Sequence, residues 1–294
     1  MEITIFTPTY NRAYIIKSLY DSLKKQTFRD FEWIVIDDGS TDNTQQLFDE
    51  IKNDAHDFPI TYLRTENQGK HCAVNRAVGL ASGRLFFIVD SDDSLPNNSL
   101  ETIEKYENSI SSEERELFAG IAGLRGAKDG SILGTTFEGD YLDITYLEAP
   151  SKNIYGDKAE VYYTEILKKY PFPQFENEIF IPESTVWNVI AADGYKLRYF
   201  NTIVYFGAYL EDGLTLQGRE KYKHIPKGYG LYLSQLVEYG QLKKLKKWES
   251  LFNYYRMFND RLSNREMANN LKMNSTRFYF RMLGMRLFYK LYNK

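Results

Sequence analysis

The sequence has few of the features that mark secreted or membrane-spanning proteins. Its single cysteine, Cys72, cannot form a disulfide within the chain. The chain opens without a charged and then apolar leader, and no stretch reaches the roughly 18 to 20 consecutive apolar residues that are needed to cross a bilayer. These absences predict a protein of the reducing cytoplasm that does not span a membrane.

Charge is segregated along the 294 residues, whose net charge is −3. Residues 241–294 hold 13 Lys and Arg against 3 acidic side chains, a balance of +10, which leaves −13 for residues 1–240. A basic segment can bind nucleic acid or an anionic membrane surface. Because the sequence has no RNA- or DNA-binding signature, we expect no nucleic-acid partner.

The end of the basic segment favours a membrane surface. Residues 275–294 combine bulky apolar residues with regularly spaced Arg and Lys, a pattern typical of an amphipathic helix that lies on anionic lipid. Packing of this helix on the rest of the protein, or on a partner subunit, is the alternative that the sequence leaves open.

The first hundred residues alternate strand-like and helix-like segments. The expected strands are 3–7, 32–37, 60–64 and 85–90, and the expected helices are 12–26, 42–52, 70–81 and one from about residue 98. Such alternation predicts an α/β fold, in which helices cover both faces of a mainly parallel sheet. Ligands of open sheets bind outside the carboxyl ends of the strands, so the residues after each strand are the candidates for a site.

The pattern changes after residue 118. We expect strands at 118–124 and 197–209, a hairpin or surface excursion at 126–140 that could contact an acceptor, and an extended segment at 172–181. A helix is expected at 184–192 with Ser184 as its cap, and amphipathic helices from about residue 230 to the end. The boundary before these helices falls near residues 215–230.

Three carboxylates end the apolar run at 85–89. Asp90, Asp92 and Asp93 are delivered together at one strand end, where Mg²⁺ or Mn²⁺ can bind through one or two carboxylates and a substrate phosphate. A calcium loop is an alternative, but Leu95 stands where that loop requires glycine. The remaining alternative is that these residues only cap a turn and the following helix.

Two earlier strand ends carry matching polar residues. Residues 8–12 follow the first strand and residues 37–40 follow the second. Asp38 can accept a hydrogen bond from a nucleobase N–H, Tyr10 offers a ring against a base, and Gly39 allows a tight turn. Because parallel strands end at one edge of the sheet, we expect the three strand ends to surround one ligand.

These segments together resemble family 2 of the nucleotide-sugar-dependent glycosyltransferases, which have the GT-A fold. The resemblance covers residues 3–100 and rests on Thr7-Pro8-Thr9-Tyr10-Asn11-Arg12, on Trp33-Ile34-Val35-Ile36-Asp37-Asp38-Gly39-Ser40-Thr41-Asp42, on Asn67-Gln68-Gly69-Lys70, on Asn75, on Ala81-Ser82-Gly83 and on Asp90-Ser91-Asp92-Asp93. It implies a Rossmann-like GT-A catalytic domain at 1–220, with a nucleotide-sugar-binding half at 1–100 and an acceptor-binding half at 101–220. A basic helical extension follows at 221–294.

The resemblance also implies roles for single residues. Asp38 would contact uracil, Lys70 the base or diphosphate, and Asp92 and Asp93 a Mn²⁺ or Mg²⁺ ion. The other donor-binding residues that it implies are Pro8, Thr9, Tyr10, Arg12, Asn67, Gly69, Asp90 and Ser91. A solvated lysine at a helix start is the alternative for Lys70, and the neighbouring His71 is more simply a packed or exposed side chain than a ligand.

A catalytic base is implied at the start of a later helix. The segment Phe180-Ile181-Pro182-Glu183-Ser184-Thr185-Val186-Trp187-Asn188 resembles the family's Glu-Asp block, with Ser184 in place of the usual Asp. The base would therefore be Glu183. The alternatives are that Glu183 only stabilises the helix dipole, and that Glu211-Asp212 supplies the base.

The expected enzyme is an inverting, metal-dependent glycosyltransferase that takes sugar from a nucleoside-diphosphate donor, most simply a UDP-sugar. Its acceptor would be a hydroxyl of a growing or lipid-linked bacterial surface glycan, such as capsule, O-antigen or teichoic acid, at the inner face of the cell membrane. A metal-dependent nucleotidyltransferase and a non-catalytic nucleotide-sugar- or calcium-binding module are the alternatives. The sequence specifies neither the sugar, the acceptor, the linkage nor the oligomeric state.

Overall fold

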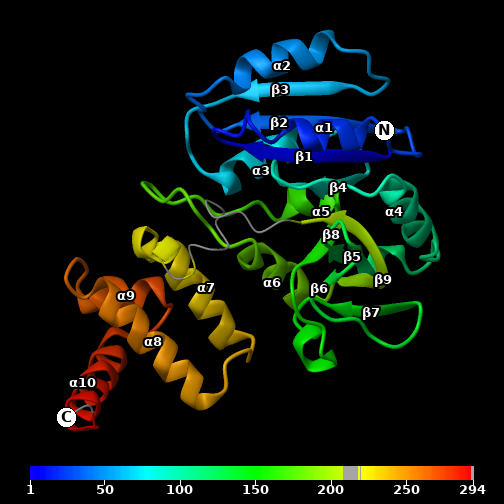
Figure 1. The fold of residues 1–294 in the computed structure, drawn as a ribbon. Helices are drawn as coiled ribbons and strands as arrows, with labels where there is room; N and C mark the ends of the chain where they lie inside the picture. The colour runs from blue at the N-terminus through cyan, green and yellow to red at the C-terminus, as the bar shows by residue number, and fades with distance from the viewer. Residues whose placement is uncertain (208–217, 219, 293–294) are drawn as a thin grey trace.

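A computed structural model describes residues 1–207, 218 and 220–292 of the chain. It contains one large mixed sheet in the order β3-β2-β1-β4-β8-β5-β9-β7, with β6 paired to β5 (Figure 1). The strands are β1 (Ile3–Thr9), β2 (Phe31–Asp37), β3 (Ile60–Arg64), β4 (Leu85–Ile88), β5 (Phe118–Gly126), β6 (Ile132–Leu133), β7 (Tyr141–Thr145), β8 (Lys158–Tyr163) and β9 (Lys196–Phe206). The predicted α/β class and central sheet are confirmed.

Strands β1 to β4 are parallel to one another, and the helices that follow them cover both faces of the sheet. Successive residues of a strand point to opposite faces, so Ile5 packs in one buried cluster and Phe6 in the other. The four helices are α1 (Lys17–Leu23), α2 (Thr44–Asn53), α3 (Lys70–Leu80) and α4 (Ser99–Asn108). The first cluster contains side chains of α1, α2 and α4, and the second contains side chains of α3.

The second half of the chain adds antiparallel pairing. Strand β8 lies between β4 and β5 and is antiparallel to both, whereas β9 runs parallel to β5. Short helices α5 (Thr164–Lys169) and α6 (Ser184–Ala192) and the 3-10 turns η1 (Arg115–Leu117) and η2 (Ala149–Lys152) complete this half. The hairpin expected at 126–140 is present where β6 turns back onto β5.

Three local expectations are corrected. Helix α1 begins at Lys17 rather than at residue 12, because hydrogen-bonded turns occupy residues 12–16. The segment expected to be extended at 172–181 is interrupted by a turn, in which the Glu178 N–H donates to the Phe175 carbonyl at 3.1 Å. Ser184 is the first helical residue of α6 and not its cap, since Glu183 occupies the N-cap position and no side chain caps the helix.

The C-terminal part of the described chain is helical. After η3 (Glu220–His224) come α7 (Pro226–Glu238), α8 (Lys244–Phe258), α9 (Asn264–Asn270) and α10 (Ser275–Tyr292), which gather beside the sheet domain in Figure 1. They enclose a buried cluster of their own around Tyr254, Phe258 and Phe278. In the described residues no helix is both long enough and apolar enough to cross a membrane.

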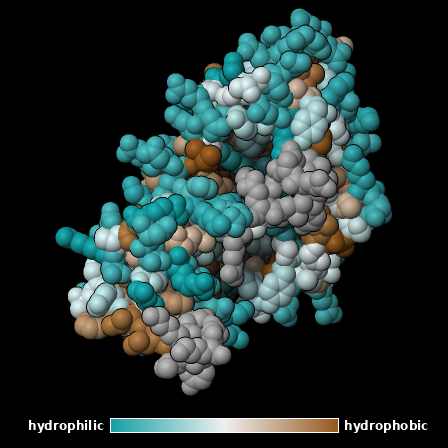
Figure 2. Space-filling view, turned by 60° about the vertical axis from the view of Figure 1, so that its left-hand side comes forward, coloured by the Kyte–Doolittle hydropathy of each residue, from teal (hydrophilic) through white to brown (hydrophobic). Residues whose placement is uncertain are grey.

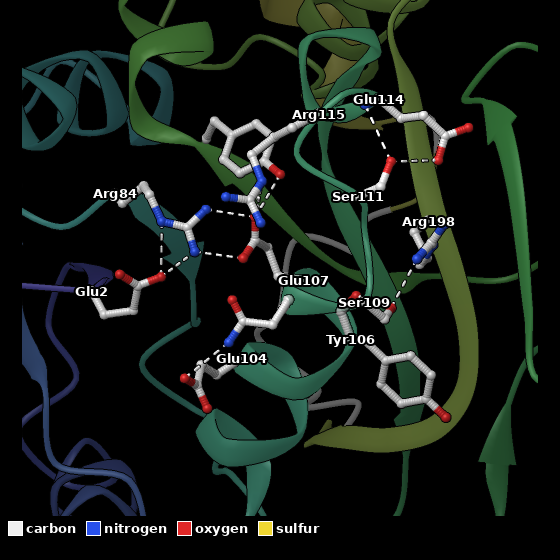
Figure 3. Close-up of polar contacts among 12 residues, drawn as sticks. Glu2, Arg84, Glu104, Tyr106, Glu107, Ser109, Ser111, Glu114, Arg115 and Arg198 are labelled. Carbon is white, nitrogen blue, oxygen red and sulfur yellow. Dashed lines mark hydrogen bonds and ion pairs between the residues drawn. The ribbon is translucent and has the colours of Figure 1, made fainter.

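A buried ion network joins the sheet to α4 (Figure 3). Glu107 of α4 is fully buried and pairs with Arg84 and with Arg115 Nε at 3.2 Å, while the Tyr163 hydroxyl donates to it at 2.7 Å. Arg84 also pairs with Glu2. Burial opposes ionisation of Glu107, but the hydrogen bonds from Arg84 and Tyr163 outweigh it and lower the pKa of Glu107.

Replacing this carboxylate should destabilise the fold and change its acid sensitivity. We expect Glu107→Gln to cost about 3 kcal/mol of unfolding free energy, because Arg84 and Arg115 lose their shared partner. A lowered pKa contributes stability above the ordinary glutamate value of 4.5, and this contribution is lost as the pH falls through the folded pKa. Urea unfolding between pH 3 and 8 measures both effects. The matched control is Glu104→Gln, one turn earlier in α4, which should change stability by less than about 0.5 kcal/mol.

Candidate active site

The carboxyl ends of β2, β1 and β4 lie side by side. The Asp38 backbone N–H donates to the Thr9 carbonyl at 2.8 Å, and the Val89 N–H donates to the Phe6 carbonyl at the same distance. The residues after the three strands are therefore brought to one edge of the sheet, as the sequence predicts. Tyr10, which follows β1 at this edge, is 47 % exposed.

Asp38 organises the loop before α3. Its two carboxylate oxygens accept the backbone N–H groups of Gln68 and Gly69, each at 2.8 Å. Burial raises the pKa of Asp38 even though these hydrogen bonds oppose the shift. A pocket of about 280 Å³ opens beside it, lined in part by Asp38, Thr65, Gln68 and Cys72.

The turns after β1 and β2 hold each other in place. Asn11 has a left-handed φ of 54°, and its side-chain oxygen accepts the Thr41 N–H at 2.7 Å. Gly39 has a φ of 87°, and a Cβ at this position would lie 3.1 Å from the Asn67 nitrogen. The turn after β2 thus lies directly against Asn67 and needs a residue without a side chain.

Lys70 connects two parts of the chain that are far apart in sequence. Its ammonium lies 2.5 Å from Asp90 Oδ1, after β4, and 2.9 Å from Glu183 Oε1, at the start of α6. Burial disfavours the charged form of Lys70, but Asp90 and Glu183 outweigh it and raise its pKa. Lys70 is therefore ion-paired and only 23 % exposed, and its two contacts bring the predicted base beside the predicted donor site.

Asp92 is the carboxylate best suited to a divalent cation. It is half-buried, and within the described residues its carboxylate forms no ion pair and is hydrogen-bonded only to its own backbone N–H. Burial and the neighbouring charge of Asp90 raise its pKa, while Arg12 and Lys70 act in the opposite direction from a distance. A cation at Asp92 would satisfy a carboxylate that now lacks a close positive partner.

Asp93 differs from Asp92 because its side chain is buried and already bonded. The Tyr205 hydroxyl donates to Asp93 Oδ2 at 2.6 Å and accepts the Asp90 N–H at 3.0 Å. In the described part of the chain, no group of three or more His, Cys, Asp or Glu side chains is arranged to hold a metal. The donor set fits an ion that is bound by one carboxylate and completed by substrate oxygens.

Sequence reasoning did not find three residues that border this site. Tyr205 of β9 forms hydrogen bonds with Asp90 and Asp93. The Arg125 guanidinium lies 4.1 Å from the centroid of the Tyr205 ring, and Arg125 Nε donates to the Lys158 carbonyl at 2.9 Å. Glu160 of β8 has a pKa raised to about 7 by burial, with the charge of Glu183 adding to the shift and Arg125 opposing it. For Arg125 and Glu160 the only sequence signal was a charge inside an otherwise apolar strand, and Tyr205 had no such signal.

The structure describes His71 but not the alternative candidate for the catalytic base. His71 is 2 % exposed, and burial lowers its pKa to about 4, as suits a packed neutral side chain. The acidic pair Glu211-Asp212, the alternative candidate for the catalytic base, lies outside the described residues.

Comparison with known proteins identifies the first third of the chain. Residues 4–108 match the family described as Glycosyl transferase family 2. The GalNAc(5)-diNAcBac-PP-undecaprenol beta-1,3-glucosyltransferase of Campylobacter jejuni is 26 % identical over 265 residues, which are 87 % of this chain and 81 % of that protein. The poly(ribitol-phosphate) beta-N-acetylglucosaminyltransferase TarS of Staphylococcus aureus is 28 % identical over 62 % of this chain, a stretch that spans only 30 % of TarS.

Solved structures share the fold at low sequence identity. TarS residues 1–349 in complex with UDP-GlcNAc superpose with a TM-score of 0.59 at 17 % identity, over 98 % of this chain and 92 % of that one. The mannosyltransferase PcManGT of Pyrobaculum calidifontis, in complex with GDP-Man and Mn²⁺, gives a TM-score of 0.58 at 18 % identity, over 100 % and 88 %. The fold of the chain is therefore GT-A.

Proposed function

We propose that the chain is a family 2 glycosyltransferase, as the match of residues 4–108 supports, and that it transfers a sugar from a nucleoside-diphosphate donor, most simply a UDP-sugar, to a hydroxyl of a surface glycan. The observation that carries the proposal is the Lys70 ammonium, which joins Asp90 at the donor edge of the sheet to Glu183 at the start of α6. Residues that would bind the leaving diphosphate and deprotonate the acceptor thus lie within one ion-paired group.

The donor would lie along the carboxyl ends of β2, β1 and β4. Asp38 and the pocket beside it would receive the nucleobase, and the exposed ring of Tyr10 on the same edge would lie against it. Pro8, Thr9, Arg12, Asn67, Gly69 and Ser91 line the same turns, and their donor contacts remain predictions. Lys70 would offer its positive charge to the diphosphate.

A Mn²⁺ or Mg²⁺ ion at Asp92, with Asp93 as a second contact, would neutralise charge on the departing diphosphate. Glu183, whose side chain is 36 % exposed, removes the proton from the acceptor hydroxyl. The acceptor oxygen then attacks the anomeric carbon as the bond to the diphosphate oxygen breaks, and the diphosphate leaves with the electron pair. A single displacement from the opposite side inverts the anomeric configuration.

A donor screen tests this function against its alternatives. Purified protein with Mn²⁺ is incubated with UDP-, GDP-, CDP- and dTDP-sugars, and diphosphate release is measured with and without acceptor glycans. A sugar transferase releases nucleoside diphosphate and elongates an acceptor. Pyrophosphate formation from a nucleoside triphosphate and a sugar phosphate would identify a nucleotidyltransferase, and tight donor or Ca²⁺ binding without any turnover would identify a binding module.

We further propose that α10 rests on the anionic inner face of the cell membrane. Phe278 and Met282 of α10 face the helical core, whereas Phe280, Leu283 and Leu287 are 64 %, 39 % and 56 % exposed. Figure 2 shows apolar side chains gathered at the end of the molecule where α10 lies. Phe280, Leu283 and Leu287 recur at helical spacing on one stripe, and Arg and Lys elsewhere in the helix suit anionic lipid.

Removing the exposed stripe should release the protein from lipid. We expect Phe280→Ser with Leu287→Ser to weaken binding to vesicles that contain phosphatidylglycerol by at least about tenfold, because each side chain loses its apolar contact with the acyl region. Co-sedimentation measures the binding. Leu117→Ser, at a 53 % exposed site on η1, is the matched control. Undiminished binding after deletion of residues 275–294 would contradict the proposal.

A further inference from the structure

The loop that leads to Glu183 is bound to the start of α7. Glu178 is 5 % exposed, and its Oε1 and Oε2 accept the backbone N–H groups of Lys227 and Gly228, each at 2.7 Å. These N–H groups belong to the first turn of α7, where no partner exists within the helix. A carboxylate at this position is favoured by the helix dipole and by two charge-assisted hydrogen bonds.

The same helix also holds the chain that follows Glu183. Gln235 in α7 is 3 % exposed, and its side-chain nitrogen donates to the Thr185 carbonyl at 2.9 Å. Its side-chain oxygen lies 3.4 Å from the amide nitrogen of Asn188. Figure 1 shows α7 beside α6, which begins directly after Glu183. Glu183 is thus bracketed by two attachments to one helix.

The opposite side of the loop contacts the donor edge. Gly69 has a φ of 89°, and a Cβ at this position would lie 1.8 Å from the Ile179 carbonyl oxygen. On the other side, a Cβ on Gly228 would lie 2.5 Å from the Ile181 side chain and 3.1 Å from Glu178 Oε2. The loop is therefore packed between a glycine beside Lys70 and a glycine at the start of α7.

We propose that α7 positions the base, and that Glu178 is the positioning residue through which it acts. The proposal rests on the function proposed above and extends it, because it makes α7, which follows the sheet domain in sequence, a working part of the catalytic site. Glu178 touches no reacting atom in this scheme. It fixes the loop whose far end carries Glu183, so that the base meets the acceptor hydroxyl at the required distance.

The direct test is Glu178→Gln. Glutamine keeps the shape but can accept only one of the two N–H groups, and its own amide N–H faces the other. We expect kcat for transfer to fall by about 10- to 100-fold, while the donor dissociation constant from calorimetry stays within about twofold. Glu176→Gln changes an exposed residue of the same loop and should leave both quantities unchanged.

A second variant approaches the same contact from the helix. Gly228→Ala adds a methyl group against Ile181 and Glu178 and should lower kcat in the same way. Gly284→Ala in α10 is its control, because nothing lies within 4 Å of a Cβ there. Thermal unfolding of each variant shows whether rates are measured on folded protein.

A double-mutant cycle separates positioning from general damage. If Glu178 acts through Glu183, Glu178→Gln should have almost no further effect on the residual rate of Glu183→Gln, measured in long incubations at high enzyme concentration. An equal loss in both backgrounds, or full activity of Glu178→Gln beside an impaired Glu183→Gln, would overturn the proposal.

Hydrogen exchange gives a readout that does not depend on turnover. The N–H groups of Val186 and Trp187 donate to the Glu183 carbonyl, so they report the order of the backbone at the base. They should exchange faster in Glu178→Gln than in Glu176→Gln. Unchanged exchange would overturn the positioning role even if no donor is found, whereas a fully active Glu183→Gln would instead remove the base and the function on which this proposal rests.

Discussion

Glu183→Gln is expected to slow sugar transfer by about 10²- to 10⁴-fold and to leave donor binding within about twofold of its original strength. The amide keeps the size of the carboxylate but cannot accept the acceptor's proton. Lys70 retains its contact with Asp90, so the donor edge of the site should keep its arrangement. Initial rates at saturating donor and acceptor, together with calorimetric donor affinity, measure the two quantities.

The matched control is Glu165→Gln in α5, whose side chain is 82 % exposed. It should leave both the rate and the donor affinity unchanged. Full transfer activity in Glu183→Gln would show that another group removes the proton, and Glu211 and Asp212 would be the next residues to replace. Loss of donor binding together with activity would show that Glu183 contributes to the donor site through Lys70 rather than acting as the base.

The donor half of the fold could be predicted because local pattern and topology agree there. Buried parallel strands appear as short apolar runs, and the sheet places every strand end at one edge, so Asp38 and Asp90 come together without any long-range information. Strand β3 has the predicted bounds, and the others differ by a few residues at their ends.

The second half could not be predicted in the same way because it depends on distant pairing. Strand β8 was missed since it carries Lys158 and Glu160, which look like surface residues. In the structure Lys158 is 5 % exposed, and its ammonium donates to the carbonyls of Thr135 and Tyr155 at 2.9 and 3.0 Å. Only the folded chain supplies these partners.

The ion pair that joins the two halves of the fold could not be predicted either. The sequence indicates Lys70 and Glu183 separately, through motifs that stand in different parts of the chain, but it does not indicate their ion pair. Tyr205, which supports Asp90 and Asp93 from β9, lies in a strand that the sequence identifies only as apolar. Contacts between segments that are far apart in sequence therefore arrange this site, and no single motif indicates them.

Asp92→Asn is expected to remove most of the metal dependence of the reaction. A cation that neutralises the leaving diphosphate contributes several kcal/mol to the transition state, so loss of its carboxylate should lower the rate by about 10³-fold. Chelation with EDTA should reduce the original protein to a similar rate, and added Mn²⁺ should restore it. In Asp92→Asn, excess Mn²⁺ should restore little, because the carboxylate itself is missing.

The neighbouring carboxylate provides the matched comparison. Asp93 already accepts a hydrogen bond from Tyr205, and an asparagine oxygen can accept the same bond, so Asp93→Asn should reduce Mn²⁺ affinity much less than Asp92→Asn. Calorimetric titration of Mn²⁺ in the presence of nucleoside diphosphate distinguishes the two. If Asp93→Asn reduces Mn²⁺ affinity more than Asp92→Asn does, Asp93 is the principal ligand. If neither variant changes Mn²⁺ binding or the rate, Asp90, Asp92 and Asp93 do not hold a metal. Lys70 and Arg12 would then supply the positive charge that neutralises the leaving diphosphate.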